Sequence, residues 1–351
     1  MELKDLSADC LERIASKLNA VDLIALASCS QHWTDIVKSC RIPIQHLYVN
    51  VIGLSWFARE SPGHSRILLG VKPIGRRFVH FFFYVRTEEE LEVIREDENT
   101  IIKMIGRRKM ICQLDETNIK VYTTTPVESF FYVLEYMLEL LSGGIHHMMF
   151  GHVYPTEDEI VLRVLRLQPV SECHRLTLPS RGHISPNLYQ YVLDSTTFYR
   201  VVIHCDVDDP FTRDTPTNIR HLDMVYAGWV TLPSLLNMNS ETIEMIEPTL
   251  TLRDMNAFAK NWLQGDNNKL RRVTIRRCRG FEWTNNEKYE LLDGLDSEEW
   301  NEAANRRERF YEDETSKIDC ENGNDFTRSD GALATFQFNE SYLHFLVFKY
   351  R

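Results

Sequence analysis

The sequence has no apolar run long enough to cross a membrane as a helix, which takes roughly 18–20 residues. Its longest dense apolar patch, FVHFFFYV at 78–85, has the length of a strand. Acidic residues occur from the second position onward, whereas a secretory signal peptide begins with basic and then apolar residues. We therefore expect the protein to act inside the cell, in the cytoplasm or the nucleus.

The cysteines of the chain offer no disulfide or metal framework. The eight residues include no Cys-x-x-Cys pair and are scattered along the sequence. Secreted domains that depend on disulfides are usually much shorter and have closely spaced cysteines. We therefore expect free cysteines in a reducing compartment, most of them acting as small buried apolar side chains.

Positive charge is also scarce, since 40 basic residues face 51 acidic ones and the formal net charge is −11. Proteins that bind nucleic acid through its phosphates usually present a net basic surface. The composition therefore argues against a broad nucleic-acid interface.

Familiar catalytic and nucleotide-binding motifs are missing: GxSxG, GxxxxGK[S/T], GxGxxG and HExxH do not occur. The histidine cluster of His146, His147 and His152 follows a Gly-Gly pair, a context more typical of a solvated loop than of a metal site. We expect a non-catalytic protein that needs no cofactor and no metal.

Three short amphipathic helices are predicted at the N-terminus. Apolar residues recur at i, i+3, i+4 and i+7 from Leu11, and again with the same spacing from Trp33. Ser7 and Ser30 stand where N-caps are needed, and Pro43 ends the run. A helical unit of this size cannot bury a full core, so we expect it to complete its core on another protein.

This stretch resembles an F-box. The string L-x-x-x-x-L-x-x-I-x-x-x-L begins at Leu6, and D-L-x-x-L-x-x-C-S and a tryptophan follow it. The family usually opens with Leu-Pro, whereas Leu6 is followed here by Ser7. The resemblance implies that residues 1–42 dock on the Skp adaptor of Skp–cullin–F-box ubiquitin ligases. The candidate contacts are the apolar residues Leu6, Leu11, Ile14, Leu18, Leu23, Leu26 and Trp33.

The sequence pattern predicts a β-rich connecting segment at residues 43–125. Short runs of β-branched and aromatic residues are separated by Gly, Pro, Glu or Asn. These runs are QHLYVNVI, SRILLGV, RFVHFFFYV, KMICQL and NIKVYTT. The simplest interpretation is a small antiparallel sheet next to the helical module.

Residues 126–351 form the third expected part, which starts with a strong helix at 128–141. Beyond it, paired apolar positions recur at intervals of 20–30 residues, with helical patterns between them. They are Leu176-x-Leu178, Val201-x-Ile203, Leu222-x-Met224, Ile243-x-Met245 and Val273-x-Ile275. This pattern predicts an α/β fold that ends in a degenerate, leucine-rich-repeat-like strand/helix solenoid. An ordinary α/β layer is the alternative.

The same region resembles the type 2 F-box-associated domain of nematode F-box proteins. The matching strings are Gly228-Trp229-Val230-Thr231-Leu232, Leu235-Leu236-Asn237, Leu252-x-Asp254-x-Asn256-x-Phe258 and Trp262-Leu263-x-Gly265. A hairpin turn at Asp330-Gly331 before the last strand also fits that domain. The order of an N-terminal F-box, a β-rich segment and this domain is the order found in the family.

A helix is predicted at 251–264, with Thr251 and Asp254 as a capping pair, Trp262 on its apolar face and Gly265 at its exit. A group of arginines follows this helix. Alternation along a strand should place Arg272 and Arg276 on one side, and Arg277 and Arg279 past the strand end should join them at one exposed surface, a candidate surface for an acidic partner. The residues are Arg272, Arg276, Arg277 and Arg279. Alternatively, these arginines neutralise the acid-rich segment from 287 to 321.

The two resemblances together imply a substrate-recognition adaptor of a Skp–cullin–F-box ubiquitin ligase, which binds the Skp adaptor through its F-box and a protein substrate through its C-terminal domain. One alternative is a protein-binding scaffold outside the ligase, with a decayed F-box. Another is a weak RNA-binding protein that uses the arginine strand.

Overall fold

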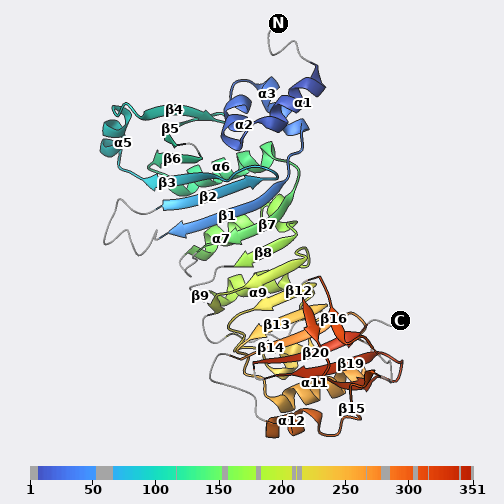
Figure 1. Cartoon of the computed structure of the whole chain (residues 1–351). Coiled ribbons are helices and arrows are strands. Elements are labelled where there is room, and N and C mark those ends of the chain that lie inside the picture. The colour runs from blue at the N-terminus through green and yellow to red at the C-terminus, as the bar shows by residue number, and fades with distance from the viewer. Residues whose placement is uncertain are drawn as a thin grey trace. The chain divides into compact units, whose positions relative to one another are not determined.

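The structure, a computed structural model, describes residues 7–52, 66–115, 117–151, 157–178, 183–207, 211, 216–265, 267–277, 285–302, 307–314, 316–339 and 341–348. The chain divides into two compact units, residues 1–183 and residues 184–351 (Figure 1). The predicted domain boundaries after residues 42 and 125 remain a prediction.

Three short helices open the N-terminal unit: α1 (Ala8–Lys17), α2 (Ala20–Ala27) and α3 (Gln31–Ser39). Ser7, Asn19 and Ser30 precede them, and each side chain accepts a hydrogen bond from the backbone N–H three residues further on. Ser7 and Ser30 are therefore the N-caps that the sequence predicts, and Asn19 is a third.

The N-terminal unit also contains a mixed sheet. Its strands are β1 (Ile44–Ile52), β2 (Arg66–Pro73), β3 (Val79–Val85), β4 (Thr100–Ile105), β5 (Arg108–Asp115), β6 (Asn118–Thr123), β7 (Ile145–Phe150) and β8 (Arg175–Leu178). They lie in the order β4-β5-β6-β3-β2-β1-β7-β8. Each strand segment predicted between residues 44 and 125 forms a strand.

The expectation of a purely antiparallel sheet was wrong. β3 pairs parallel with β6, and β1 pairs parallel with β7. A parallel pair needs a crossover connection, and the helix α5 (Glu88–Arg95) with the β4–β5 hairpin supplies it between β3 and β6. Neither α5 nor β4 was predicted from the sequence.

The helix predicted at 128–141 is α6 (Pro126–Leu140), which covers one face of this sheet. Phe83 of β3 meets Phe130 of α6 edge to face, with 5.9 Å between ring centroids, and both side chains are fully buried. The unit also contains α7 (Asp158–Leu165) and α8 (Gln168–Ser171).

The C-terminal unit is also mixed α/β. Its helices are α9 (Pro186–Asp194), α10 (Leu232–Leu236), α11 (Leu252–Gln264) and α12 (Asn285–Leu292). Its longer strands are β10 (Arg200–Ile203), β12 (His221–Met224), β13 (Thr242–Ile246), β14 (Arg272–Arg276), β18 (Asn324–Thr327), β19 (Leu333–Phe338) and β20 (Tyr342–Phe348). The shorter strands are β11 (Asp206–Val207), β15 (Glu298–Glu299), β16 (Phe310–Glu312) and β17 (Lys317–Asp319), and β9 (His183–Ile184) lies where the units divide.

The repeated apolar positions lie side by side on parallel strands. Val201 pairs with Leu222, Leu222 with Ile243, and Ile243 with Val273. Beyond β14 the sheet continues with antiparallel strands in the order β20-β19-β18-β15. The parallel ladder is the arrangement that stacked strand/helix repeats would give, but the antiparallel end is not a further repeat. The solenoid therefore remains a prediction.

Helix α11 has the predicted ends and the predicted buried face. Thr251 and Asp254 form a reciprocal capping box, and Gly265 is the C-cap. Trp262 is 3% exposed, and its ring packs against Phe345 and Phe326 with 5.5 and 6.3 Å between centroids. The helix thus packs against the antiparallel strands β18 and β20.

Candidate functional site

The apolar residues of the N-terminal helices divide into a buried and a half-exposed set. Leu11 and Leu23 are 3% and 1% exposed, so they hold the helices together and are not accessible to a partner. The prediction that Leu11 and Leu23 contact an adaptor is corrected accordingly. Because they are buried in the chain's own core, they stabilise the helices.

The second set keeps part of its surface in solvent. Ile14 lies in α1, Leu18 is its C-cap residue, Leu26 lies in α2 and Trp33 in α3. All four side chains are half-buried. Leu6, the remaining candidate, lies outside the described residues. Apolar groups left partly exposed on a small helical unit are suited to a protein interface.

The helices are fixed to the sheet below them. The guanidinium of Arg76 donates hydrogen bonds to the carbonyls of Leu18 and Ala15, at 2.8 and 3.0 Å, and so satisfies the end of α1. Lys38 of α3 forms an ion pair with Glu139 of α6. This anchoring gives the half-exposed apolar residues a fixed position.

The arginine strand differs from its prediction. Arg272 is 3% exposed, and its guanidinium pairs with Asp313 at 2.9 Å and with Glu244 at 3.5 Å. Arg272 also donates to the hydroxyl of Thr274 at 3.3 Å, so Asp313, which follows β16, lies at the face that these two residues share. Arg272 is therefore not part of an exposed surface, and it neutralises acids as the alternative interpretation expected.

The other described arginines of this set, Arg276 and Arg277, differ in exposure. Arg276 is exposed, and its guanidinium lies 5.5 Å from the ring centroid of Tyr342. Arg277 is half-buried, and its backbone N–H donates to the carbonyl of Ser341. Arg279 lies outside the described residues. Of the three arginines that the structure describes in this set, Arg276 is the exposed one.

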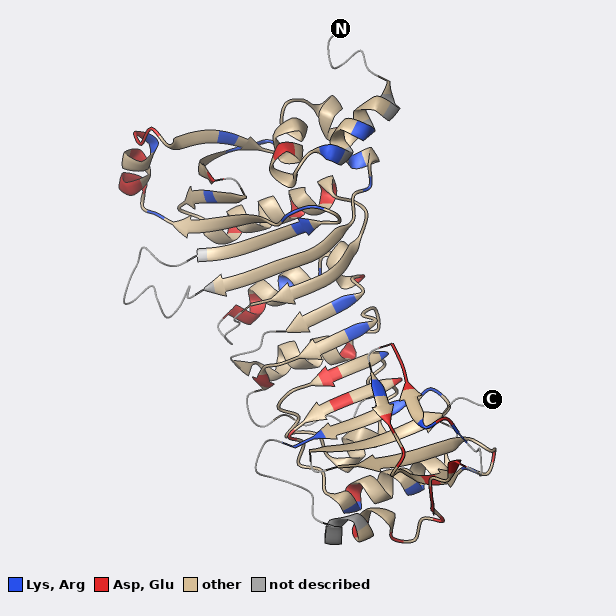
Figure 2. Ribbon diagram, viewed as in Figure 1, with Lys and Arg blue, Asp and Glu red and all other residues tan. Residues whose placement is uncertain are grey.

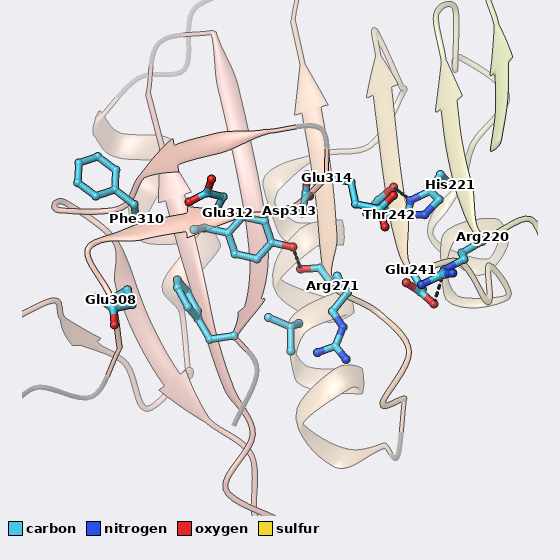
Figure 3. Close-up of a pocket in the computed structure, with 13 residues that line it drawn as sticks. Arg220, His221, Glu241, Thr242, Arg271, Glu308, Phe310, Glu312, Asp313 and Glu314 are labelled. Carbon is cyan, nitrogen blue, oxygen red and sulfur yellow. Dashed lines mark hydrogen bonds and ion pairs between the residues drawn. The ribbon is translucent and has the colours of Figure 1, made fainter. Parts of the chain in front are cut away.

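A pocket of about 430 Å³ lies in the C-terminal unit, where the segment of β16 approaches the first residues of β12 and β13 (Figure 3). Its lining comes from short pieces of the chain that are far apart in sequence, so no local motif signals it. The lining residues are Arg220, His221, Glu241, Thr242, Arg271, Glu308, Phe310, Tyr311, Glu312, Asp313, Glu314, Val347 and Phe348.

Polar contacts order one wall of this pocket. Arg220 pairs with Glu241 at 2.7 Å and lies 4.8 Å from the centroid of the Tyr199 ring. The Tyr199 hydroxyl donates to Glu314 at 2.9 Å. His221 shares a hydrogen bond with Thr242 at 2.8 Å, and burial together with Arg220 lowers its pKa, which favours a neutral imidazole. These contacts fix the shape of a polar recess that could receive a side chain of a partner.

Other kinds of site find little support in the described parts of the chain. Within them, no group of three or more potential metal ligands lies together. No described helix is both long enough and apolar enough to span a membrane. His147 is hydrogen-bonded to Thr177 at 2.9 Å and lies beside His46, while His152 lies outside the described residues.

Two segments of the chain match known domain families. Residues 3–45 match the F-box domain, and this match contains α1, α2 and α3. Residues 211–275 match an F-box associated family, and this match contains β12, α10, β13, α11 and β14.

Three proteins of Caenorhabditis elegans are similar to parts of the chain. F59B2.8 is 26% identical over 234 residues, which are 62% of this chain and 52% of that protein. F59B2.9 is 32% identical over 136 residues, or 37% and 30% of the two chains. The E3 ubiquitin-protein ligase hecw-1 is 44% identical over 50 residues, or 14% and 4%. This chain thus spans about half the length of F59B2.8 and less of the others. No solved structure matches the chain.

The family matches fall on the segments whose motifs pointed to them, and they occur in the expected order. The chain thus combines a segment that matches the F-box domain, residues 3–45, with a later segment that matches an F-box associated family, residues 211–275.

Proposed function

We propose that this protein is the substrate-recognition adaptor of a Skp–cullin–F-box ubiquitin ligase. The F-box match over three capped helices is the observation that carries the proposal. The Skp adaptor would bind these helices, and the unit with the F-box-associated domain would capture a protein substrate. The similarity of a short stretch to an E3 ubiquitin-protein ligase agrees with this pathway.

The mechanism is a gain in effective concentration, not a covalent step. A protein held on the C-terminal unit stays close to the ligase's transfer machinery, so that modification becomes nearly intramolecular. The protein itself would be non-catalytic and would act in the cytoplasm or the nucleus. The seven described cysteines are all free, as a reducing compartment would leave them.

Ile14, Leu18, Leu26 and Trp33 are the adaptor contacts in this proposal. Leu11 and Leu23 act indirectly, by holding the helices in place. In the C-terminal unit, we assign the parallel strands and their helices to a degenerate, leucine-rich-repeat-like solenoid, and the pocket beside β16 is one place for a substrate side chain.

The test is co-purification with the Skp adaptor. Changing Leu18→Ala and Trp33→Ala together should abolish the complex, because truncating a buried interface anchor costs about 2–4 kcal/mol. A matched control changes Val93→Ala and Ile101→Ala, which are 71% and 41% exposed outside the F-box. The control should bind like the parent.

Unchanged adaptor binding by the Leu18/Trp33 variant would contradict the proposed interface. If the parent itself fails to bind the adaptor, the decayed-F-box scaffold becomes the better account. The missing Leu-Pro lead-in makes that outcome worth testing.

A further inference from the structure

The sheet of the N-terminal unit has two faces of different character. One face carries Phe81 and Phe83 and is buried against α6. On the other face, which we call the open face, the β3 side chains that alternate with them, His80, Phe82 and Tyr84, are half-buried, whereas Asn50 of β1 is 8% exposed. Its aromatic and histidine members are His46, Tyr48, Phe78, His80, Phe82, Tyr84, Tyr122 and His147.

Several rings of the open face form a row of offset stacks, although His80 and Phe82 are tilted by 48° and His46 meets His147 edge to face. Phe78 and His80 lie 5.3 Å apart between centroids with planes 5° from parallel, and Tyr84 and Tyr122 lie 5.5 Å apart at 24°. At such distances, nearly parallel rings turn their faces toward one another. The ring edges are then left accessible, and the edge is the electropositive part of an aromatic ring. The row therefore favours negatively charged groups.

Basic side chains surround this row. Lys72, Lys120 and Arg175 occupy open-face positions on β2, β6 and β8, and the guanidinium of Arg86 lies 5.6 Å from the centroid of Tyr84. Figure 2 shows blue on the ribbon of β2 and no red on β1, β2 or β3. Asp115 is the one acid at an open-face position of the described strands, and it accepts a hydrogen bond from Asn118.

The lowered pKa values of two open-face histidines agree with a positive field at this face. Burial is the main cause that lowers the pKa of His46, and Lys72 and Arg175 lower it further. Burial and then Arg175 lower the pKa of His147 to about 4. Both imidazoles are therefore neutral at pH 7, so lysines and arginines supply the charge. A positive face on a chain of net charge −11 is a marked segregation of charge.

We propose that the open face binds an extended, acidic segment of the captured protein. Half-exposed Leu68, Ile111 and Met149 lie on the same face, so a segment that alternates acidic with apolar residues fits it best. This inference rests on the proposed function, in which the chain captures a protein, and it names the chemical class of that protein.

Nucleic acid is the less suitable occupant. Single strands bind proteins by stacking their bases on exposed ring faces, and here the ring faces are turned toward one another. The overall negative charge of the chain also repels a long polyanion, whereas a short acidic segment meets mainly the local positive field.

The experiment uses the full chain in complex with the Skp adaptor, or alone if no complex forms. The probe is a fluorescein-labelled peptide of about 15 residues in which glutamate alternates with leucine and valine, long enough to cross several strands. A second peptide has lysine in place of glutamate, and a third probe is an oligouridylate of matching length. Fluorescence anisotropy measures each dissociation constant at low and moderate salt.

Charge reversal at Lys72→Glu and Lys120→Glu should weaken binding of the acidic peptide by about tenfold. The matched control, Lys269→Glu with Lys317→Glu, makes the same change in net charge at exposed residues elsewhere, and it should leave affinity within about twofold. The lysine peptide should not bind, and the affinity of the acidic peptide should fall as salt rises. Circular dichroism checks that all variants fold.

Three results would overturn the inference: unchanged affinity after reversal of Lys72 and Lys120, an equal loss in the control variant, or tighter binding of the oligouridylate than of the acidic peptide. Adaptor co-purification is measured on the same samples. If the parent fails to bind the adaptor but binds the acidic peptide as described, the proposed function fails while the open-face site stands.

Discussion

The ion pair of Arg307 and Asp325 is a buried charge pair whose removal should be costly. Arg307 Nε lies 2.8 Å from Asp325 Oδ1, and the two side chains are 1% and 3% exposed. Arg307 also donates to the carbonyl of Cys320 at 2.8 Å, and Asp325 accepts from Thr335 at 2.6 Å. Both charges are thus paired and further hydrogen-bonded, the condition under which a buried pair is tolerated.

Arg307→Met should destabilise the C-terminal unit by about 3–5 kcal/mol, because it leaves the Asp325 carboxylate buried without its cation. Asp325→Leu should cost a similar amount for the opposite reason. The double variant removes both charges, so its loss should be smaller than the sum of the single losses by about 2 kcal/mol or more.

Urea unfolding followed by tryptophan fluorescence can measure this cycle. Trp300 is a local reporter, since its ring lies 5.6 Å from the Arg307 guanidinium. The chain has two units, so the transition of the C-terminal unit must be fitted separately from that of the N-terminal unit. Strictly additive losses in the double variant would show that the two charges do not interact, and the reasoning would fail.

Three further outcomes are expected. Trp262→Ala should destabilise the C-terminal unit by about 3–5 kcal/mol. Trp262→Phe should cost clearly less, because Nε1 of Trp262 has no hydrogen-bond partner within the described structure and the ring is largely kept. Equal losses of the two variants in a urea titration would contradict this. Burial and Arg272 lower the pKa of His344 from 6.5 to about 4, so the folded state takes up fewer protons and loses stability as pH falls from 6.5 to 4. His344→Gln should flatten this dependence in thermal melts, and an unchanged slope would refute it. Arg272→Glu should destabilise the C-terminal unit by about 3–5 kcal/mol, because the new carboxylate faces Glu244 and Asp313. If Arg272 were an exposed surface residue, the same substitution would cost almost nothing.

Local patterns predicted the local structure well. The caps at Ser7, Ser30 and Thr251 and the exit of α11 at Gly265 depend on residues three or four positions apart, which the sequence displays directly. The apolar positions on β10, β12, β13 and β14 were also predicted, because each strand has a pair of apolar residues two positions apart and these pairs recur at a similar interval along the chain.

Features that depend on distant segments were not predicted. Alternation along β14 correctly put Arg272 on the face opposite Val273, but it could not show that Asp313, which follows β16, lies at that face. The parallel pairing of β3 with β6 was missed because the charged segment of α5 gave no strong helical signal. Of the seven predicted adaptor contacts, four are half-exposed, and periodicity alone could not separate them from the buried Leu11 and Leu23.

The position of β20 has a consequence for how the protein is made. Residues 342–348 are the last to leave the ribosome among those described, yet they form an interior strand between β14 and β19. Until they emerge, two strand edges of the nascent chain stay open, and such edges invite pairing with other chains. The sheet of the C-terminal unit can therefore be completed only after residue 348 has been translated. A premature stop codon before residue 342 would yield a protein with a complete F-box and an aggregation-prone substrate unit.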